Sequence, residues 1–432
     1  MKRKKLSRIY SYILHQIYNE KHSNLALLAE LLIVSCIVWY LVDCSYTIIA
    51  RNTEPTGFDA TNCYNLVLEK LGAETIGYDS EHPESEEEEI AAKLALLDRI
   101  RRDADIEAAA FSVRNDPYDL SSRTSGIRYD TPNDTLEAFP RFIQCQPDFL
   151  KVFRYRSLTG KTPEQLADLL KDNQILLSEG IFGKEHDVRQ LIGKEIFLGY
   201  YGPNPYRLRL GDVIAPVKRY DAEELIYTNV AVLTLQGDDW LVEDGRMLSL
   251  SIRVKEGRTK GFEERFREKI ANKKMRAGNY YVSNIISYEA RKQSIMRESY
   301  EQMRFYAVAL AFLLVNVFFG LLGTFWFRTQ QRFSEIGLQK ALGATNTDIT
   351  LRLLTEAAWV LTIAFIPSLI IDWSIADAGV TNPYRGVTFE TERFIVCAAI
   401  TYGIMLLIIA LGIWFPALRA TKSHPAEVLR GE

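Results

Sequence analysis

Four long apolar segments constrain this chain more than any other feature of its sequence. They lie at residues 25–50, 305–328, 353–376 and 394–416. A helix of about 20 residues is needed to cross the hydrocarbon core of a bilayer, and each segment reaches that length. We therefore expect a membrane α-helical protein with four transmembrane helices.

Acidic side chains interrupt the first and third apolar segments. We expect Asp43 and Asp372 to lie near the outer ends of their helices, close to water, with Glu30 within the first segment. We place Glu356 in the first turns of its helix, where a carboxylate favours the helix dipole. Charged groups inside a membrane are costly and often functional. A packing or capping role is the preferred interpretation, and a proton relay is the alternative.

Lys and Arg residues predict the orientation, because cytoplasmic loops are richer in them than external loops. They occur in the leader at 1–24, in the loop at 329–350 and in the tail at 417–432. We expect a multi-pass protein of the bacterial inner membrane with both termini in the cytoplasm. Residues 51–303 and the short loop at 377–393 would then lie outside. In the leader, isoleucines at a spacing of four predict a basic amphipathic helix on the inner leaflet, and a disordered leader is the alternative.

The section at 51–286 mixes strand and helix patterns. Apolar residues alternate with polar ones over 247–254, then recur at helical spacing from Phe262 to Ile270, and a further strand pattern covers 280–286. We therefore expect an α+β extracytoplasmic domain. We interpret it as two α+β halves with a strand-rich insertion around 196–235.

Residues 287–304 keep helical spacing but carry many charges, so they do not belong in lipid. No proline or glycine separates them from the second span. We expect one continuous helix in which 287–304 forms a stalk, and the alternative is a kinked turn near Arg304.

Motifs for catalysis, metal binding and nucleotide binding do not emerge from the sequence. Gly160-Lys161-Thr162 resembles the end of a phosphate-binding loop, but Tyr155 stands where that loop needs its first glycine. Thr162, Pro163 and Gln165 instead form a helix-capping sequence. We expect no enzyme activity, metal or cofactor in this chain. A net charge of −3 gives no indication of nucleic-acid binding.

The five cysteines are scattered singly. Cys63 and Cys145 are the two well inside the outward domain, which would lie in an oxidising compartment. A Cys63–Cys145 disulfide is therefore one hypothesis, and two free thiols are the other.

The segment after the second span has a distinctive sequence. It reads QRFSEIGLQKALGAT over 331–345, and the tail contains FPALRA at 415–420 followed by HPAEVLR at 424–430. Together with Thr355-Glu356-Ala357, these stretches resemble the permeases of MacB/FtsX-type ABC transport systems. Leu338 and Leu342 offer an apolar edge between two glycines that we expect to bracket a short helix. The segment matched to the family's ATPase-coupling element contains Arg332, Glu335, Ile336, Gly337, Leu338, Lys340, Leu342, Gly343 and Ala344.

The resemblance implies a particular set of partners. The family works as a homodimer or a closely related heterodimer of permeases with two ABC ATPase subunits. Only 24 residues precede the first span here, so we expect the ATPase on a separate chain, which would hold ATP and Mg²⁺. A periplasmic adaptor and an outer-membrane channel are further partners that the resemblance suggests.

Two functions are compatible with the resemblance. The first is mechanotransmission, in which the ATPase drives export or extraction of a peptide, antibiotic or lipoprotein-like substrate. The second is an FtsX-like regulator that activates a cell-wall hydrolase without transport. An outward domain of about 250 residues favours the first. A two-span sensor is disfavoured by the third and fourth spans.

Overall fold

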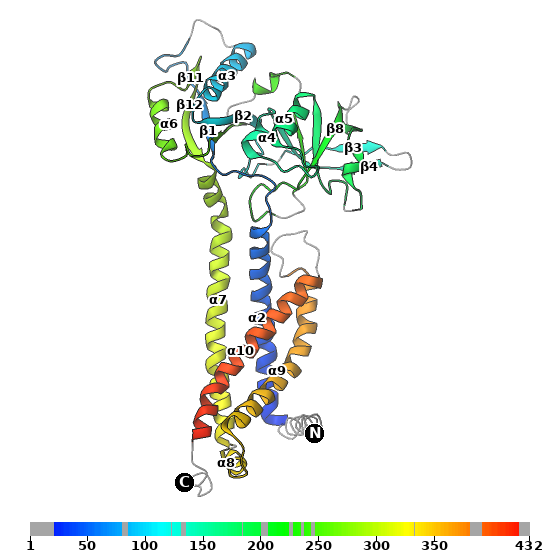
Figure 1. Ribbon diagram of the computed structural model, residues 1–432, viewed down its shortest axis with the longest axis vertical. Coiled ribbons are helices and arrows are strands. Elements are labelled where there is room, and N and C mark those ends of the chain that lie inside the picture. The colour runs from blue at the N-terminus through cyan, green and yellow to red at the C-terminus, as the bar shows by residue number, and fades with distance from the viewer. Residues whose placement is uncertain are drawn as a thin grey trace. The chain divides into compact units, whose positions relative to one another are not determined.

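The computed structural model consists of two compact units. The membrane unit comprises Met1–Ala50 and Tyr300–Glu432, and the sheet unit comprises Arg51–Ser299 (Figure 1). The structure describes residues 21–79, 85–121, 123–130, 135–183, 185–199, 206–223, 228–234, 237–242, 247–331, 333–380 and 391–422. The amphipathic helix predicted in the leader therefore lies largely outside the described residues.

Four helices of the chain are long and apolar enough to cross a membrane. They are α2 (Lys21–Thr53), α7 (Tyr288–Gln331), α9 (Asn346–Asp377) and α10 (Thr391–Lys422), and the short α8 (Phe333–Ala341) lies between α7 and α9. The predicted fold class, membrane helices together with an α+β domain, is confirmed. At 1.5 Å per residue the 44-residue α7 is about 66 Å long. It passes Arg304 without a break, so the kinked turn is not found.

Buried contacts hold α2 against α10 in the membrane unit. The ring of Trp39 lies 5.4 Å from that of Phe394, and Asp43 pairs with Arg393 at 3.1 Å. Asp43 and Asp372 are fully buried, so the expectation that both lie close to water is wrong. Glu356 is also buried and lies ten residues into α9, well past its first turns. The neighbouring helices, rather than solvent or a helix end, surround these acids.

The sheet unit is built on one twelve-stranded mixed sheet. Its strand order is β11-β12-β1-β10-β2-β5-β9-β6-β8-β7-β3-β4. The β5–β9 and β6–β8 pairs are parallel, and the other neighbours run antiparallel. The strands are β1 (Cys63–Lys70), β2 (Ile106–Val113), β3 (Ile127–Asp130), β4 (Thr135–Ala138), β5 (Arg141–Cys145), β6 (Gln174–Ser178), β7 (Glu195–Leu198), β8 (Tyr206–Ile214), β9 (Val230–Leu233), β10 (Leu248–Val254), β11 (Arg276–Ala277) and β12 (Tyr280–Ser287).

Helices cover the sheet in two places. Figure 1 shows α3 (Glu86–Arg101) and α6 (Phe262–Ala271) beside β1, β11 and β12, and α4 (Phe149–Phe153) and α5 (Pro163–Lys171) farther along the sheet. Two 3₁₀ helices, Val188–Leu191 and Asp239–Val242, complete the described elements. The predicted strand, helix and strand correspond to β10, α6 and β12.

The strand-rich block at 196–235 is not an insertion between two halves. Its strands β8 and β9 both pair with β6, and β9 also pairs with β5. The block therefore supplies integral strands of the continuous sheet. Sequence periodicity identifies strands of this kind but not their neighbours.

The helix cap predicted from Gly160-Lys161-Thr162 is present. The Thr162 hydroxyl accepts a hydrogen bond from the Gln165 backbone amide at 3.4 Å. The Gln165 side-chain oxygen in turn accepts one from the Thr162 backbone amide at 2.9 Å. Pro163 is the first residue of α5. These residues start a helix, which leaves the phosphate-loop interpretation without support.

Cys63 and Cys145 are free thiols. They lie on β1 and β5, and two strands, β10 and β2, separate them in the sheet. Three strand spacings of about 4.8 Å place them roughly 14 Å apart or more, well beyond the reach of a disulfide. Burial raises the pKa of the Cys63 thiol to about 12, and this thiol donates a hydrogen bond to the Val152 carbonyl at 3.2 Å. The hypothesised bridge is therefore not formed.

Candidate functional site

The segment matched to a coupling element folds as a helical hairpin. We call it the coupling hairpin: α8, the turn at 342–345 and the first two turns of α9. Ile336 on α8 and Ile349 on α9 are 5% and 3% exposed, and Ala344 and Leu353 pack against them. This small apolar cluster holds the two helices together.

The turn of the hairpin depends on Gly343. Its φ is +92°, a conformation that favours glycine, and its amide donates to the Lys340 carbonyl at 2.9 Å. Thr345 then caps α9 in a reciprocal pair of hydrogen bonds with Asp348. Gly337 lies buried inside α8, so the expectation that the two glycines bracket the helix holds at Gly343 and fails at Gly337.

Glu335 makes its polar contacts within the hairpin. One of its oxygens accepts hydrogen bonds from the Arg352 guanidinium at 3.1 Å and from the Gln339 side-chain amide at 3.3 Å. A pair of this kind, only partly shielded from solvent, contributes less than about 1 kcal/mol. Glu335 therefore braces α8 against α9.

Two leucines face away from the hairpin core. Leu338 is 53% exposed and Leu342 is 80% exposed. Counted at 100° per residue, Leu338 lies on the side of α8 opposite to Ile336, and Leu342 follows in the turn directly after the helix. The hairpin thus presents an apolar edge on a braced helix.

Six of the nine matched residues divide into three groups. Ile336, Gly337 and Ala344 belong to the inner side of the hairpin, while Leu338 and Leu342 face outward, and Arg332 lies outside the described residues. Sequence reasoning missed Ile349 and Arg352, which complete the core and the ion pair. A sequence signal for Ile349 was available, because Ile349 and Leu353 are four residues apart at the start of a capped helix.

A second arrangement concerns the end of α2 and the start of α7, both inside the sheet unit. We call it the helix clamp, formed by Lys218, Asp221, Asp116 and Arg253. Lys218 is 1% exposed. Its ammonium donates to the Arg51 carbonyl at 2.9 Å and to the Glu54 carboxylate at 2.8 Å. A lysine placed this way satisfies a carbonyl at the C-terminal end of a helix.

The start of α7 is held by two carboxylates of the helix clamp. Asp116 is fully buried and accepts from the Tyr288 hydroxyl at 2.5 Å and the Arg291 guanidinium at 2.6 Å. Asp221 accepts from the Lys292 ammonium at 2.7 Å. Asp221 is also tied to Lys218, which donates to its carbonyl at 3.2 Å. One short stretch of chain therefore holds both helices.

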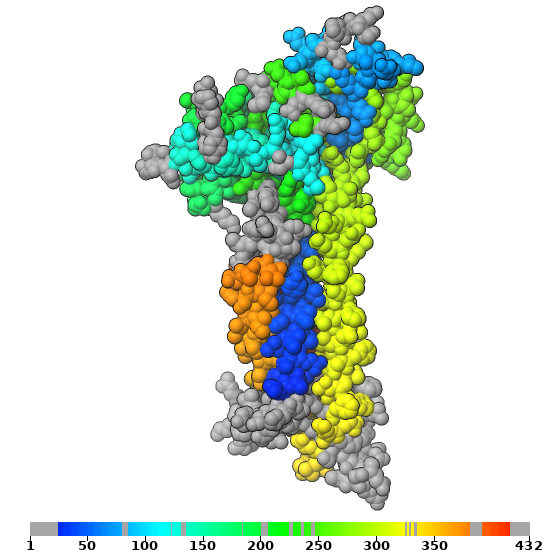
Figure 2. All heavy atoms as spheres, turned by 180° about the vertical axis from the view of Figure 1, so that it is seen from behind, coloured from blue at the N-terminus to red at the C-terminus, as the bar shows by residue number. Residues whose placement is uncertain are grey.

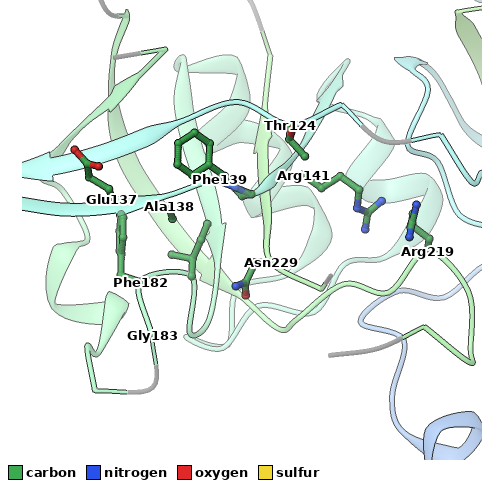
Figure 3. A pocket seen from close by; sticks show the side chains of 11 residues that line it. Thr124, Glu137, Ala138, Phe139, Arg141, Phe182, Gly183, Arg219 and Asn229 are labelled. Atoms are coloured by element: carbon green, nitrogen blue, oxygen red, sulfur yellow. The ribbon is translucent and has the colours of Figure 1, made fainter. Parts of the chain in front are cut away.

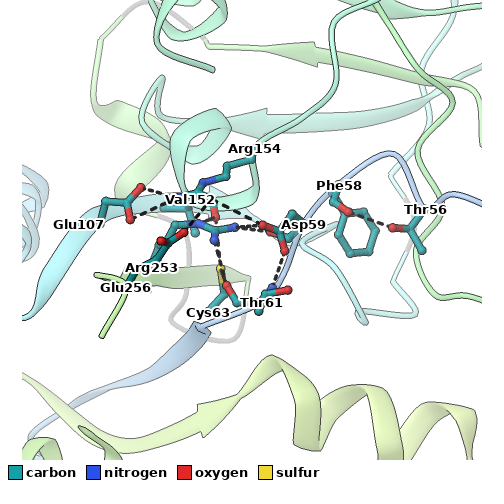
Figure 4. Close-up of polar contacts among 10 residues, drawn as sticks. All are labelled: Thr56, Phe58, Asp59, Thr61, Cys63, Glu107, Val152, Arg154, Arg253 and Glu256. Carbon is teal, nitrogen blue, oxygen red and sulfur yellow. Dashed lines mark hydrogen bonds and ion pairs between the residues drawn. The ribbon is translucent and has the colours of Figure 1, made fainter. Parts of the chain in front are cut away.

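Arg253 fixes the connection between α2 and β1. Figure 4 shows its guanidinium reaching the stretch from Asp59 to Thr61. It donates to the carbonyls of Val152 at 2.6 Å, Thr61 at 2.9 Å and Asp59, and it is 2% exposed. A buried cation with this many acceptors makes the connection stiff.

Metal binding has no support in the part of the chain that the structure describes. There, no three His, Cys, Asp or Glu side chains come together in a way that could hold an ion.

Residues 307–425 match the family model of the FtsX-like permease C-terminal domain. This match covers the last three apolar helices in part or whole and the coupling hairpin. No protein with a curated description matches the chain.

Parts of the chain show weak similarity to solved structures. The periplasmic region of MacB from Actinobacillus actinomycetemcomitans is 12% identical, with 55% of this chain and 94% of that chain covered and a TM-score of 0.32. A domain of a putative permease from Porphyromonas gingivalis is 16% identical, with 44% and 76% covered and a TM-score of 0.32. The extracellular domain of the ABC-type transporter YknZ from Gram-positive bacteria is 13% identical, with 52% and 100% covered and a TM-score of 0.27. Scores this low carry no conclusion.

The ion pair of the coupling hairpin leads to a first prediction. Glu335→Lys places two cations together, and we expect amide exchange of 333–341 in the full chain to become about two- to fivefold faster. Hydrogen exchange followed by mass spectrometry measures this. The charge-swapped double variant, Glu335→Lys with Arg352→Glu, should return the rate toward that of the unchanged chain. Equal rates in the single and double variants would contradict the bracing role.

The helix clamp leads to a second prediction. Lys218→Met keeps most of the side-chain volume but removes the ammonium, so the Arg51 carbonyl and the Glu54 carboxylate lose their donor. We expect amide exchange at 51–56 to rise about tenfold or more, with β6 and β9 unchanged. Lys255→Met is the matched control. Lys255 is an exposed lysine whose ammonium donates a hydrogen bond to the Ala104 carbonyl, which is not part of the clamp. If the two variants exchange alike, Lys218 does not hold α2.

Proposed function

Starting from the FtsX-like permease family, to which residues 307–425 belong, we propose that this chain is the permease subunit of an ABC system. A separate ATPase subunit would bind ATP and Mg²⁺ and would contact the coupling hairpin. The chain itself would hydrolyse nothing. The export or extraction of a peptide, antibiotic or lipoprotein-like substrate is the activity we assign to the assembled system.

The observation that carries this proposal is the exposed leucine edge of the coupling hairpin. Burial of a leucine side chain contributes about 1.5–3 kcal/mol, so Leu338 and Leu342 together can anchor a partner protein. The inner face of α8 is meanwhile held by Ile336 and by the Glu335–Arg352 pair. A push on the leucine edge would therefore move α8 and α9 as one body.

The helix clamp supports mechanotransmission. Because the end of α2 and the start of α7 are held by buried charged groups, a displacement of either helix would pass into the sheet unit instead of being absorbed by a loose connection. The uncharged stretches at 305–327 and 394–415 offer no polar path for a substrate. This favours work done on the sheet unit over passage between the spans.

We place the chain in the bacterial inner membrane with both termini in the cytoplasm and the sheet unit outside, following the Lys and Arg distribution. A periplasmic adaptor and an outer-membrane channel would complete an exporter. The outward section of about 250 residues favours transport over the hydrolase-activating alternative.

The leucine edge leads to a third prediction. Leu342→Asp and Leu338→Asp each place a charge in the contact with the ATPase. We expect each to lower co-purification of the ATPase and the ATP hydrolysis of the complex about tenfold or more. Gly343→Val should act in the same direction, because valine strains a φ of +92°.

The control for these variants is Leu120→Asp, which changes a leucine of similar exposure, 59%, in the sheet unit. It should leave co-purification and hydrolysis unchanged. Expression and membrane insertion are checked for every variant. Full activity and co-purification in both hairpin leucine variants would show that this segment is not the coupling element.

We also propose that two copies of the chain pair through α7. Figure 2 shows α7 as the yellow-green to yellow helix. Five large apolar residues over 305–319 of this helix are 53–71% exposed: Phe305, Val308, Phe312, Val315 and Phe319. Lipid would cover any apolar face equally well. The separations between these five residues alternate between three and four positions, which is the pattern by which one helix packs along a second helix. This pattern favours a homodimer or a closely related heterodimer.

The α7 seam leads to a fourth prediction. In membranes under mild oxidation, Val315→Cys should form a cross-linked dimer of the full chain. Val317→Cys is the matched control, because Val317 is 6% exposed and packs against its own chain; it should not exceed the background of the unchanged chain. Equal cross-linking at both positions would contradict the seam.

A further inference from the structure

A cavity of about 290 Å³ lies in the sheet unit, and one of its lining residues, Arg219, directly follows Lys218 of the helix clamp. Its walls come from β4, β5 and the turn after β6, together with Thr124, Arg219 and Asn229. Arg141, Phe139, Phe182 and Glu137 are among the lining residues. Figure 3 shows the guanidinium groups of Arg141 and Arg219 toward one end and the rings of Phe139 and Phe182 toward the other. The cavity is thus polar and cationic at one end and apolar at the other.

Arg141 is the unusual member of this cavity. It is 5% exposed, yet no ion pair joins it to a carboxylate among the described residues. Its two terminal nitrogens donate to the carbonyls of Asn115 at 3.4 Å and Val217 at 2.9 Å, and its Nε has no hydrogen-bond partner in the part of the chain that the structure describes. A buried guanidinium that lacks an acid is costly unless a ligand compensates its charge.

The charged groups around Arg141 favour a bound anion. Glu223 pairs with Arg219 at close range, and among the described residues it forms no ion pair with Arg141. Burial lowers the pKa of Arg141, opposed by the charge of Glu223 and reinforced by that of Arg219. Tyr155 and the more distant Asp119 are the other titratable groups that act on it. One carboxylate bound beside Nε would supply the missing acceptor.

The opposite end restricts the rest of the ligand. Phe139 is 58% exposed at the rim, while Phe182 is 7% exposed and belongs to the apolar core. Glu137 lies at this end as well, and its charge disfavours a second anionic group there. A ring or short alkyl group fits these walls better than a second charge does.

We propose that this cavity binds a small amphipathic monocarboxylate, with its carboxylate on Arg141 and its apolar group between Phe139 and Phe182. The site is a property of the sheet unit and does not depend on the coupling hairpin or on an ATPase. The two proposals can therefore fail separately.

The test uses 3-phenylpropionate as the probe, with 3-phenylpropan-1-ol and 3-phenylpropylamine as neutral and cationic analogues of the same shape. Isothermal titration of the purified full chain should show saturable binding of the carboxylate at least about tenfold tighter than either analogue. Equal affinities for the three compounds, or no saturable binding of the carboxylate up to its solubility limit, would overturn the proposal.

Variants then locate the site. Arg141→Gln removes the charge and should weaken binding about tenfold or more, with amide exchange confirming that β5 remains folded. Phe139→Ser changes an exposed residue with little risk to the fold and should weaken binding several-fold. Tyr206→Ser, at an equally accessible aromatic residue outside the cavity that is 70% exposed, is the matched control. Unchanged affinity in both Phe139→Ser and a folded Arg141→Gln would place the binding elsewhere and overturn the assignment.

Discussion

The connection between the sheet and α7 depends on the hydrogen bonds and the ion pair of the buried Asp116 carboxylate. It accepts hydrogen bonds from Ser249 on β10 at 2.9 Å and from Tyr288 and Arg291 in the first turn of α7. Removing one partner of such a buried pair typically costs about 3–5 kcal/mol, because the remaining charge is left uncompensated. The first turn of α7 is thus attached to the sheet by charged groups that solvent cannot replace.

Much of the fold could be predicted from local sequence patterns. The absence of proline and glycine between Ser287 and Arg304 predicts the continuous α7, and the Thr162 capping sequence predicts the start of α5. These features depend on residues close together in the chain, where periodicity and capping chemistry act. The order of strands in a sheet depends on residues far apart in the chain, and for this reason the predicted placement of the strands at 196–235 is wrong. Cys63 and Cys145 illustrate the same limit, since spacing along the chain says nothing about the two strands between them.

The candidate site was predictable as a segment but not as a set of contacts. The motif located the coupling hairpin, and the pattern around Leu338 and Leu342 indicated its apolar edge. The partner of Glu335 could not be inferred, because Arg352 lies 17 residues away on another helix. Lys218 and Arg141 carried no sequence signal at all. Their importance arises from burial, which is a property of the folded sheet unit.

The coupling hairpin and the helix clamp differ in the strength of their contacts, and the difference fits their proposed roles. The hairpin is held by a two-isoleucine core and an ion pair whose side chains remain 27% and 36% exposed. Each of these contacts is individually weak, and together they join α8 to α9 so that the two helices would move as one body. The clamp is held by Lys218, Asp116 and Arg253, all at most 2% exposed. In the proposed mechanism the hairpin has only to move as one body, whereas the clamp has to pass a displacement of α2 or α7 into the sheet unit, which requires contacts that solvent does not replace.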